Sequence, residues 1–334
     1  MRINIVGAGM MGTAMAVPAL DRGHDVRVIG TPLDNEIIAG LKENGYHITM
    51  KRMIGDGAGY YRYDEIAEEL NDCDILICGV SSFGVEWFAS EILPKLESGK
   101  TVLAITKGLW RTESGDLMPF PIYFKSLRPD ISFNAVGGPC TSYELADKVH
   151  TQVAFCGDDI ETVKMLRDAL TTDYYHVSAT TDICGIEAAV ALKNAYAMAV
   201  SLAIGLYTGN DPDGIEKYNA QAGLFYQAIK EMSSLIARLG GKSEALAFGA
   251  GDLYVTVFGG RTRRLGTILG SGVTFSEAKK MLAGVTLESV AITKLIGAHI
   301  CNEAANYPLM EHIYTLLTTD TVKEIPWDKM TFTY

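Results

Sequence analysis

Residues 2–12 read RINIVGAGMMG, a short apolar run that leads into glycines at Gly7, Gly9 and Gly12. We expect a strand to end near Gly7, a helix to follow, and a second strand to occupy residues 25–30. This order of elements is what a Rossmann dinucleotide-binding fingerprint requires. Gly7 permits the tight turn, Gly9 lets the backbone approach a pyrophosphate, and Gly12 lets the helix pack closely on the strand. The stretch therefore predicts a doubly wound α/β domain that binds a nicotinamide dinucleotide.

The end of the second predicted strand should select between NAD and NADP, because an acid there binds the ribose 2′-hydroxyl of NAD. The tip reads Gly30-Thr31-Pro32, and Asp34 and Glu36 come too late in the sequence to be assigned to the ribose. No arginine stands at the tip to bind a 2′-phosphate either. We therefore assign Thr31 to the cofactor site and leave NAD and NADP open, with the missing acid slightly favouring NADP.

The α/β pattern continues through the first half of the chain. We expect further strands over residues 74–80, 101–106, 131–137 and 151–156. Sites in doubly wound sheets lie at the carboxyl ends of the strands, so Ser81, Lys107 and the turn at Gly138 are candidates by position. Met10 and Met11, inside the glycine turn, complete the predicted cofactor site.

The second half of the chain is predicted to be helical. From about residue 181, long apolar segments with helical spacing replace the strand pattern. We therefore divide the chain into a Rossmann domain over residues 1–180 and an all-α domain over residues 181–334. Residues 208–218, TGNDPDGIEKY, form a polar stretch between two predicted helices, which we interpret as an insertion rather than a lid.

Lys193 lies on the apolar face of the helix predicted over residues 184–206. The apolar residues that share its face are Ile186, Ala189, Val190, Ala197 and Val200. A lysine on a buried face is rare unless it is paired or functional. Loss of water lowers the pKa of a lysine, which suits proton exchange near neutral pH. The alternative is a lysine that extends from a contact between helices to reach water.

Residues 259–266, GGRTRRLG, contain the only dense group of basic side chains in an acidic sequence. Arg261, Arg263 and Arg264 follow a pair of glycines. Guanidinium groups bind phosphate or carboxylate through two parallel hydrogen bonds, so the segment predicts a site for an anionic substrate. Asp252, an acid in a glycine-rich stretch shortly before it, is a further candidate.

Composition limits the classes of function. The chain has 334 residues, of which 48% are hydrophobic and 21% charged, as in a globular protein. The formal net charge of −11 argues against non-specific binding to nucleic acid. We expect no membrane span and no signal peptide. The six cysteines stand singly among apolar neighbours, so we expect reduced core thiols in a cytoplasmic protein, and no metal site.

Taken together, these motifs resemble the NAD(P)-dependent glycerol-3-phosphate dehydrogenase family over about residues 2–317. The matching motifs, in the order of the family, are the glycine fingerprint, Lys107-Gly108-Leu109, Gly138-Pro139 with Glu144, Glu187 with Ala191-Leu192-Lys193-Asn194, Asn219 through Glu231-Met232, Gly251-Asp252-Leu253 and Gly259-Gly260-Arg261. The resemblance implies an α/β Rossmann doubly wound N-terminal domain and an all-α C-terminal domain of the 6-phosphogluconate-dehydrogenase-like type.

The resemblance also implies the reaction, which interconverts dihydroxyacetone phosphate and sn-glycerol 3-phosphate by hydride transfer with NAD or NADP. Lys193 would be the general acid/base, Lys107 would polarise the substrate oxygen, and Asp252 would orient the site. The chemistry agrees, because hydride transfer to a ketone leaves a developing alkoxide that a lysine stabilises and protonates.

The resemblance assigns substrate binding to the helical domain as well. Arg261 would bind the substrate phosphate, with Thr262 and Asn194 as further substrate contacts. Glu288 falls where the family has an acidic or amide residue near the cofactor. We expect the active site in a cleft between the two domains, and a cytoplasmic homodimer.

Several positions depart from the family pattern: Thr262 replaces the usual asparagine, Gln221 a lysine, Gln227 an arginine and Gly137 a serine. Residues 140–142 and the stretch over residues 208–218 differ from the pattern as well. We interpret these changes as lying around the substrate. One alternative is therefore a related reductase of another small phosphorylated or carboxylated keto compound, like the ketopantoate reductases or the 3-hydroxyisobutyrate dehydrogenases. A redox sensor that binds NAD(P) without turnover is a third reading, against which the presence of all three catalytic candidates argues.

Overall fold

The computed structural model describes residues 1–208 and 217–331, and the chain divides into two compact units. The first unit is Met1–Trp110 with Met118–Glu187, and the second is Arg111–Leu117 with Ala188–Tyr334. The division thus falls after Glu187, a little beyond the predicted boundary, and one short segment of the first half joins the second unit. The loop predicted over residues 208–218 lies mostly outside the described residues.

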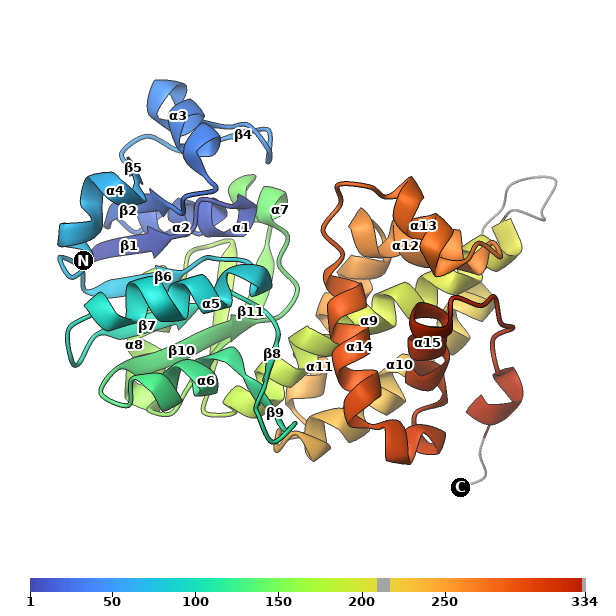
Figure 1. The fold of residues 1–334 in the computed structure, drawn as a ribbon. Coiled ribbons are helices and arrows are strands. Elements are labelled where there is room, and N and C mark those ends of the chain that lie inside the picture. Colours follow the sequence, from blue (N-terminus) through green and yellow to red (C-terminus); the bar gives the residue numbers. More distant parts are fainter. Residues whose placement is uncertain (209–216, 332–334) are drawn as a thin grey trace. The chain divides into compact units, whose positions relative to one another are not determined.

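The first unit is built on an eight-stranded sheet (Figure 1). The strands, in order across the sheet, are β12 (Tyr175–Thr180), β11 (Thr151–Gly157), β10 (Ser132–Gly137), β7 (Thr101–Ala104), β6 (Ile75–Cys78), β1 (Arg2–Val6), β2 (Asp25–Gly30) and β5 (Gly59–Arg62). All neighbouring strands are parallel except β10 and β11. The predicted doubly wound fold is confirmed.

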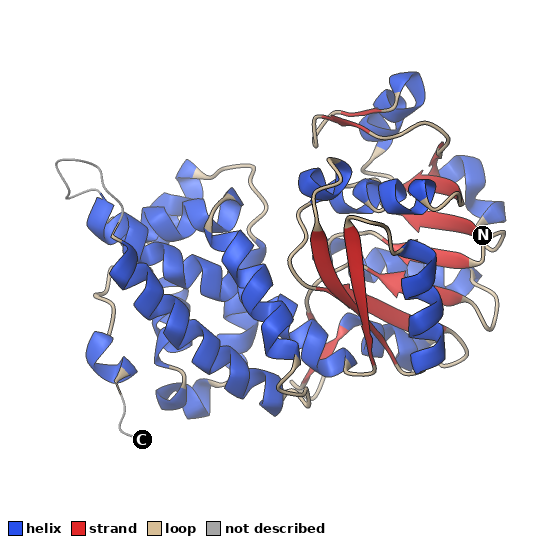
Figure 2. Ribbon diagram, turned by 180° about the vertical axis from the view of Figure 1, so that it is seen from behind, coloured by secondary structure: helices blue, strands red, loops and turns tan. Residues whose placement is uncertain are grey.

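Helices cover both faces of this sheet (Figure 2). On one face, α1 (Met10–Ala14), α2 (Ala16–Asp21) and α8 (Ile160–Leu170) pack on the strands, whereas α5 (Val85–Trp87) and α6 (Phe120–Leu127) lie on the other. Ile3 and Ile5 on β1 belong to the core of the first face, together with Val163 and Leu166 from α8. Because successive strand residues point to opposite faces, a sheet covered on both sides needs nearly continuous apolar strands.

Several short elements of this unit were not predicted. They include the two edge strands β5 and β12, the helices α3 (Asn35–Asn44), α4 (Tyr63–Ile66) and α7 (Ser142–Ala146), and the hairpin of β3 (Tyr46–His47) with β4 (Arg52–Met53). The hairpin of β8 (Leu109–Arg111) with β9 (Leu117–Pro119), whose connecting segment belongs to the second unit, was not predicted either. A two-residue strand has no room for a periodic pattern, and the alternation of β12 is polar on its exposed side.

The second unit consists mainly of helices (Figures 1 and 2). They are α9 (Ile183–Thr208), α10 (Tyr218–Arg238), α11 (Ala245–Val257), α12 (Gly260–Gly270), α13 (Phe275–Met281), α14 (Glu288–His299) and α15 (Pro308–Thr319), followed by a short 3₁₀ turn at Trp327–Met330. The predicted all-α domain is thereby confirmed.

Helix α9 is the core helix of the second unit. Contrary to the expectation from the sequence, this helix of 26 residues is long and apolar enough to cross a membrane by length and composition alone. Within the protein, however, 83% of its most apolar window is buried. Its apolar composition is thus explained by contacts with the helices around it.

All six cysteines are free thiols. Cys78 and Cys156 are buried in strands, as expected for core thiols, and burial raises the pKa of both. Cys301 is exposed, so the prediction of a core thiol is wrong there. It begins a 3₁₀ turn after α14, where the chain is at the surface.

Candidate functional site

The glycine turn after β1 has the shape that its sequence requires. Gly7 has φ +111°, a conformation that side chains disfavour, and a Cβ there would lie 2.6 Å from the backbone of Gly79 at the end of β6. A Cβ on Gly12 would lie 2.1 Å from the carbonyl oxygen of Gly7. The turn, α1 and the adjacent strand can therefore pack this closely only because these two residues lack side chains.

A pocket of about 460 Å³ opens beside this turn, and its walls include four of the predicted cofactor residues, Gly7, Gly9, Thr31 and Ser81. The other lining residues are Pro32, Leu33, Asp34, Gly79, Val80, Phe83, Gly84 and Trp87. A Cβ on Gly9 would meet no described atom within 4 Å, so the backbone there faces open space. A dinucleotide fits this arrangement, because its phosphates can approach the bare backbone at Gly9.

Asp34 also belongs to this pocket, which corrects the prediction that it comes too late in the sequence. The chain turns sharply after β2, where the amide of Asp34 donates to the carbonyl of Thr31 at 2.9 Å. The carboxylate then accepts hydrogen bonds from the amide and hydroxyl of Thr31, both at 2.8 Å. An acid is thus present at the tip of the strand, and the argument for NADP from a missing acid no longer holds.

Lys107 lies at the carboxyl end of β7, where its ammonium group donates to the carbonyl of Gly138 at 3.2 Å. Strands β7 and β10 are parallel neighbours, so the turns that follow them meet at one edge of the sheet. Met11 shares a small cavity with Lys107 and Gly138. The structure therefore brings Lys107, Met11 and the turn at Gly138 together, as their positions after strands predict.

Glu187 is a buried acid to which we assign no role in binding or catalysis. It is fully buried, and neither carboxylate oxygen has a hydrogen-bond partner among the described residues. Burial raises the pKa of Glu187 to about 8, and the positive charge of Lys107 lowers it in part. Its carboxyl group is therefore mainly protonated at neutral pH.

The second unit holds an ion pair between Lys193 on α9 and Asp252 on α11. The lysine Nζ donates to Asp252 Oδ1 at 2.6 Å, and the two side chains are only 13% and 1% exposed. The prediction that Lys193 lies on a buried face is confirmed, since all five apolar residues predicted to share that face are buried. The carboxylate thus fixes the position of the lysine amine.

Close packing of α9 and α11 aligns the two charges. A Cβ on Gly249 would lie 2.8 Å from Cβ of Ala189, so glycine lets the two helices approach. Asp252 follows Gly249 by three residues and Lys193 follows Ala189 by four, which places each charge one turn beyond the contact on the same face of its helix. Gly249 thus has a packing role.

Two further predicted residues meet in the second unit. Asn194 donates to Glu288 at 3.5 Å, at the distance limit of a hydrogen bond, and Glu288 is the first residue of α14. Glu288 was assigned to the cofactor and Asn194 to the substrate.

Met10, another predicted cofactor residue, lies in the first unit, where it is 36% exposed at the start of α1.

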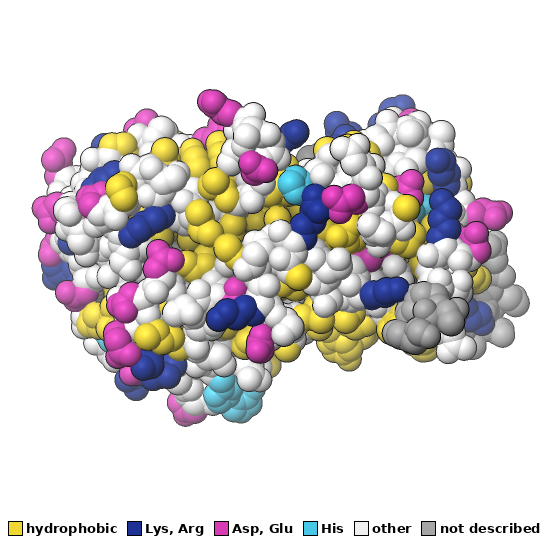
Figure 3. Space-filling model, turned by 90° about the horizontal axis from the view of Figure 1, so that it is seen from below, with side chains coloured by type: hydrophobic (Ala, Val, Ile, Leu, Met, Phe, Trp, Pro, Cys, Tyr) yellow, Lys and Arg dark blue, Asp and Glu magenta, His cyan; other side chains and the backbone are white. Residues whose placement is uncertain are grey.

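The predicted arginine cluster lies at the start of α12. Arg261 and Arg264 are exposed, Thr262 is half-buried, and Arg263 donates to the carbonyl of Val257 at 2.8 Å. No hydrogen bond or ion pair joins Arg261 to another residue of the described ranges, so its guanidinium is available to an anion. Acidic and basic side chains are interspersed on the face shown in Figure 3, so an anion requires such a local group of cations.

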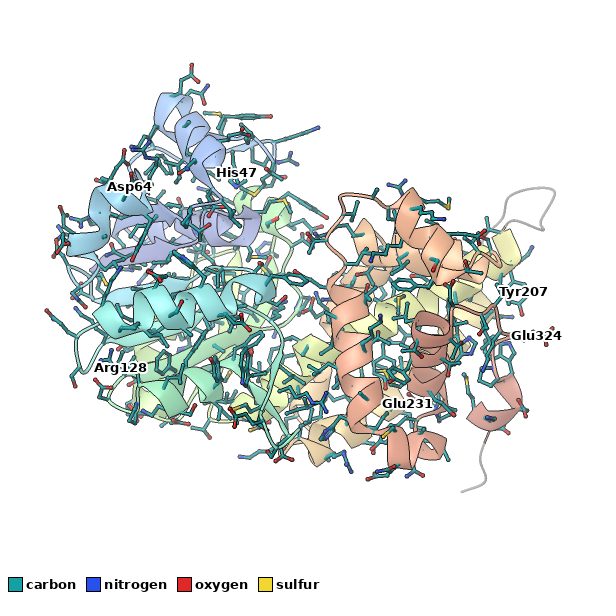
Figure 4. The ribbon with its side chains drawn as sticks, in the orientation of Figure 1. His47, Asp64, Arg128, Tyr207, Glu231 and Glu324 are labelled. Carbon is teal, nitrogen blue, oxygen red and sulfur yellow. The ribbon has the colours of Figure 1, made fainter. Side chains whose placement is uncertain are left out.

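Gln227 corrects the prediction that the departures from the family pattern surround the substrate. It lies in α10, is 3% exposed, and donates to Glu231 at 2.8 Å. Glu231, labelled in Figure 4, in turn accepts hydrogen bonds from the hydroxyl of Tyr196 and from the first amides of α15, at Leu309 and Met310. Gln227 is therefore part of a buried network that joins α9, α10 and α15.

The two units offer complementary chemistry. The first has a backbone-lined pocket with a lysine at the same edge of the sheet, and the second has a buried ammonium group with a group of arginines. No group of three or more histidine, cysteine or acidic side chains within residues 1–208 and 217–331 could hold a metal ion. Two residues that contact the glycine turn were not predicted to do so: Asp34 was set aside, and His47 was not considered. Their contacts depend on how the chain folds back after β2, which no sequence motif reveals.

Comparison with known protein families identifies both regions of the chain. Residues 2–163 match the family model described as NAD-dependent glycerol-3-phosphate dehydrogenase N-terminus. Residues 182–325 match the corresponding C-terminus model. These matches favour the resemblance predicted from the motifs over the alternative families of reductases.

Individual relatives agree with the family models. The chain is 33% identical over 287 residues to the NADP(+)-dependent glycerol-3-phosphate dehydrogenase of Archaeoglobus fulgidus, and the matched region covers 84% of each chain. It is 28% identical over 323 residues to glycerol-3-phosphate dehydrogenase [NAD(P)+] of Agathobacter rectalis, covering 96% of this chain and 92% of the relative. The crystal structure of glycerol-3-phosphate dehydrogenase from Coxiella burnetii has the same fold, with a TM-score of 0.82, 24% identity, and coverage of 98% and 97%.

Proposed function

This chain belongs to the NAD-dependent glycerol-3-phosphate dehydrogenase family, and we propose that it interconverts dihydroxyacetone phosphate and sn-glycerol 3-phosphate by hydride transfer with NAD or NADP. It is an NAD(P)-dependent oxidoreductase that acts on a CH–OH group. The observation that carries the assignment of catalytic residues is the ion pair of Lys193, which is 13% exposed, with the buried Asp252. Protonation of a reduced ketone requires a positioned proton donor, and an ammonium group fixed by a carboxylate can act as one.

The pocket beside Gly9 is our proposed site for the dinucleotide. Gly7 and Gly9 form a wall without side chains, and Thr31 and Ser81 bring hydroxyl groups to it. When bound, the reduced nicotinamide supplies the hydride that goes to the ketone carbon. In our proposal, these residues hold the dinucleotide and leave the proton chemistry to the lysines.

Lys193 is our proposed general acid for reduction of the ketone. As hydride reaches the carbonyl carbon, the oxygen acquires negative charge and accepts a proton from the ammonium group of Lys193. In the reverse direction, neutral Lys193 takes the hydroxyl proton from the glycerol phosphate. Asp252 fixes the position of the amine through its 2.6 Å hydrogen bond.

The remaining cations stabilise charge on the substrate. We assign Lys107 to the developing negative charge on the oxygen, since its ammonium group is held by the carbonyl of Gly138. Arg261, with a guanidinium that no described residue engages, binds the substrate phosphate. Thr262 and Asn194 are assigned as further substrate contacts, and Glu288 as a residue near the cofactor.

The choice between NAD and NADP is left to experiment. The relative from Archaeoglobus is named NADP(+)-dependent, whereas that from Agathobacter is named for both nucleotides. Asp34 lines the pocket, but the carboxylate oxygen Oδ2 already accepts three hydrogen bonds from Thr31 and Ala8. A carboxylate engaged in this way shapes the turn and is not free to select the ribose through that oxygen.

We further propose that the enzyme is a cytoplasmic homodimer, as the family resemblance implies. Six free thiols suit a reducing compartment. Light scattering of the purified protein measures the mass directly, and a monomer at all concentrations would contradict the dimer.

The proposed function is tested by following the absorbance of NADH and of NADPH, separately, with dihydroxyacetone phosphate and purified protein. Rapid oxidation of either nucleotide confirms the reaction and identifies the preferred cofactor. Oxidation only with another phosphorylated or carboxylated keto compound, such as ketopantoate, would support the related-reductase alternative. Nucleotide binding without turnover of any of these compounds would support the sensor.

A further inference from the structure

The peptide groups on either side of Ala8, in the middle of the glycine turn, are held by three side chains. The amide of Ala8 donates to Asp34 Oδ2 at 3.2 Å. Its carbonyl accepts from the hydroxyl of Thr13 at 3.0 Å and lies 3.0 Å from Nε2 of His47. Thr13 belongs to the fingerprint itself, whereas His47 comes from the β3–β4 hairpin, which is no part of that motif.

The hydrogen bonds of His47 define its protonation state. Its Nδ1 lies 3.1 Å from the backbone amide of Met50, which can only donate, so Nδ1 carries no proton. The ring proton is therefore on Nε2, and the neutral imidazole donates it to the carbonyl of Ala8. Burial lowers the pKa of His47, although the hydrogen bond to Ala8 and the charge of Asp34 oppose this.

The hairpin that carries His47, labelled in Figure 4, packs on the unit through buried side chains. His47 is 0% exposed, and Met50 and Ile54 after it are buried in the main core of the sheet domain. On the other strand of the hairpin, the guanidinium of Arg52 donates to both carboxylate oxygens of Asp147, at 2.7 and 3.0 Å. The position of the His47 ring against the carbonyl of Ala8 is therefore fixed by the packing of the hairpin.

We propose that His47 is a positioning residue for the dinucleotide, which holds the carbonyl of Ala8 so that Gly7 and Gly9 keep the conformation that lines the nucleotide pocket. The inference rests on our assignment of that pocket to the dinucleotide. His47 does not line the pocket. It acts only through the Ala8 peptide, and it therefore affects binding of the nucleotide and not the chemistry of the substrate.

The effect of this contact is expected to be moderate. A turn that is ordered before binding loses little conformational entropy when the ligand arrives. Without His47, the carbonyl of Ala8 still accepts a hydrogen bond from Thr13. Loss of one of two hydrogen bonds is expected to raise the dissociation constant of the nucleotide about fivefold to tenfold.

Two substitutions separate the two contacts of the ring. The amide nitrogen of glutamine takes the place of Nε2, so His47→Gln retains the donor to Ala8 and loses the acceptor for Met50. The oxygen of asparagine takes the place of Nδ1, so His47→Asn retains the acceptor and loses the donor to Ala8. The pair therefore distinguishes support of the glycine turn from support of the hairpin.

Titration of NADH into each protein, followed by its fluorescence below the unfolding temperature of every variant, tests the proposal. We expect His47→Asn to weaken binding about fivefold to tenfold and His47→Gln to stay within about twofold of wild type. The turnover number and the KM for dihydroxyacetone phosphate should stay unchanged at saturating nucleotide. Wild-type affinity in His47→Asn, equal weakening in both variants, or a lower turnover number with unchanged affinity would overturn it. If wild type itself bound no nucleotide, the proposed function would fail instead.

Discussion

The glycine turn of the first unit and the lysine–aspartate pair of the second are built in opposite ways. The turn is made of backbone, and its shape depends on the absence of side chains at Gly7 and Gly12, whereas Gly9 leaves the space beside the turn open. The pair is made of two side chains, Lys193 and Asp252, that lie 59 residues apart in the sequence and on different helices. One site is therefore damaged by adding atoms and the other by removing a charge.

This difference also separates the tasks of the two regions in our account. A backbone site binds phosphates without any titratable group, so its affinity should be insensitive to the loss of a particular charge. The buried pair contributes a proton, so its loss should reduce turnover and leave nucleotide affinity intact. The following predictions test this separation, from the largest expected effect to the smallest.

Lys193→Met should lower the turnover number about a thousandfold, because the general acid is lost, while NADH binds as in wild type. Initial rates with dihydroxyacetone phosphate and a fluorescence titration of NADH measure the two quantities. Lys279→Met, at an exposed position of α13, is the matched control and should change neither. A turnover number within about tenfold of wild type would remove Lys193 from the mechanism.

Arg261→Lys should raise the KM for dihydroxyacetone phosphate about tenfold or more, because lysine keeps the charge but not the two parallel donors. The control is Arg264→Lys, which changes an exposed arginine of the same helix and should alter KM less than about twofold. Steady-state kinetics at saturating nucleotide measure both. An unchanged KM in Arg261→Lys would contradict the assignment and show that the cluster acts only through its net charge, which both substitutions preserve.

Gly9→Ala should weaken nucleotide binding about tenfold or more and leave the unfolding temperature close to that of wild type. The added methyl group meets no described atom within 4 Å, but it occupies space that the pyrophosphate requires. In Gly12→Ala, the added carbon lies 2.1 Å from the Gly7 carbonyl, so this variant should lose stability as well. Nucleotide titration and thermal unfolding together separate the two effects, and unchanged affinity in Gly9→Ala contradicts the assignment of the pocket.

Glu187→Gln should change the pH dependence of stability. Burial raises the pKa of Glu187 from 4.5 to about 8, so folding retains a proton that the unfolded chain releases. The free energy of unfolding of wild type should therefore fall between those pH values by up to about 1.4 kcal/mol per pH unit from this group. The variant should be more stable than wild type at about pH 9, with a difference that shrinks towards about pH 5. Denaturant unfolding at each pH measures this free energy. If it changed with pH in the same way in wild type and in Glu187→Gln, a neutral Glu187 would be contradicted.

The parts predicted correctly from the sequence are those with local causes. The glycine turn and the strands β1 and β2 follow from residues adjacent in the chain, and the burial of the Lys193 face follows from the period of one helix. Lys193 and Asp252 were also both predicted as site residues from the sequence. Their contact depends on the approach of α9 and α11 at Gly249, which no local pattern reveals.

The errors have a common origin in tertiary contacts. Asp34 was placed too far from the tip of β2 because its distance was judged along the chain, whereas a turn brings its carboxylate back to Thr31. Gln227 was assigned to the substrate region because of the residue type it replaces, although its amide serves the buried Glu231. His47 lies on a two-residue strand, for which the sequence pattern offers no prediction.

The central claim, that Lys193 supplies the proton for reduction of dihydroxyacetone phosphate, is tested most directly by chemical rescue. Lys193→Ala leaves the space of the missing amine, and methylamine added to the assay can occupy it. The account predicts that the slow oxidation of NADH or NADPH accelerates in proportion to the concentration of methylammonium, and that Arg261→Lys shows no such response. Turnover of Lys193→Ala at the wild-type rate, or a rate that methylamine leaves unchanged while nucleotide and substrate still bind, would contradict it.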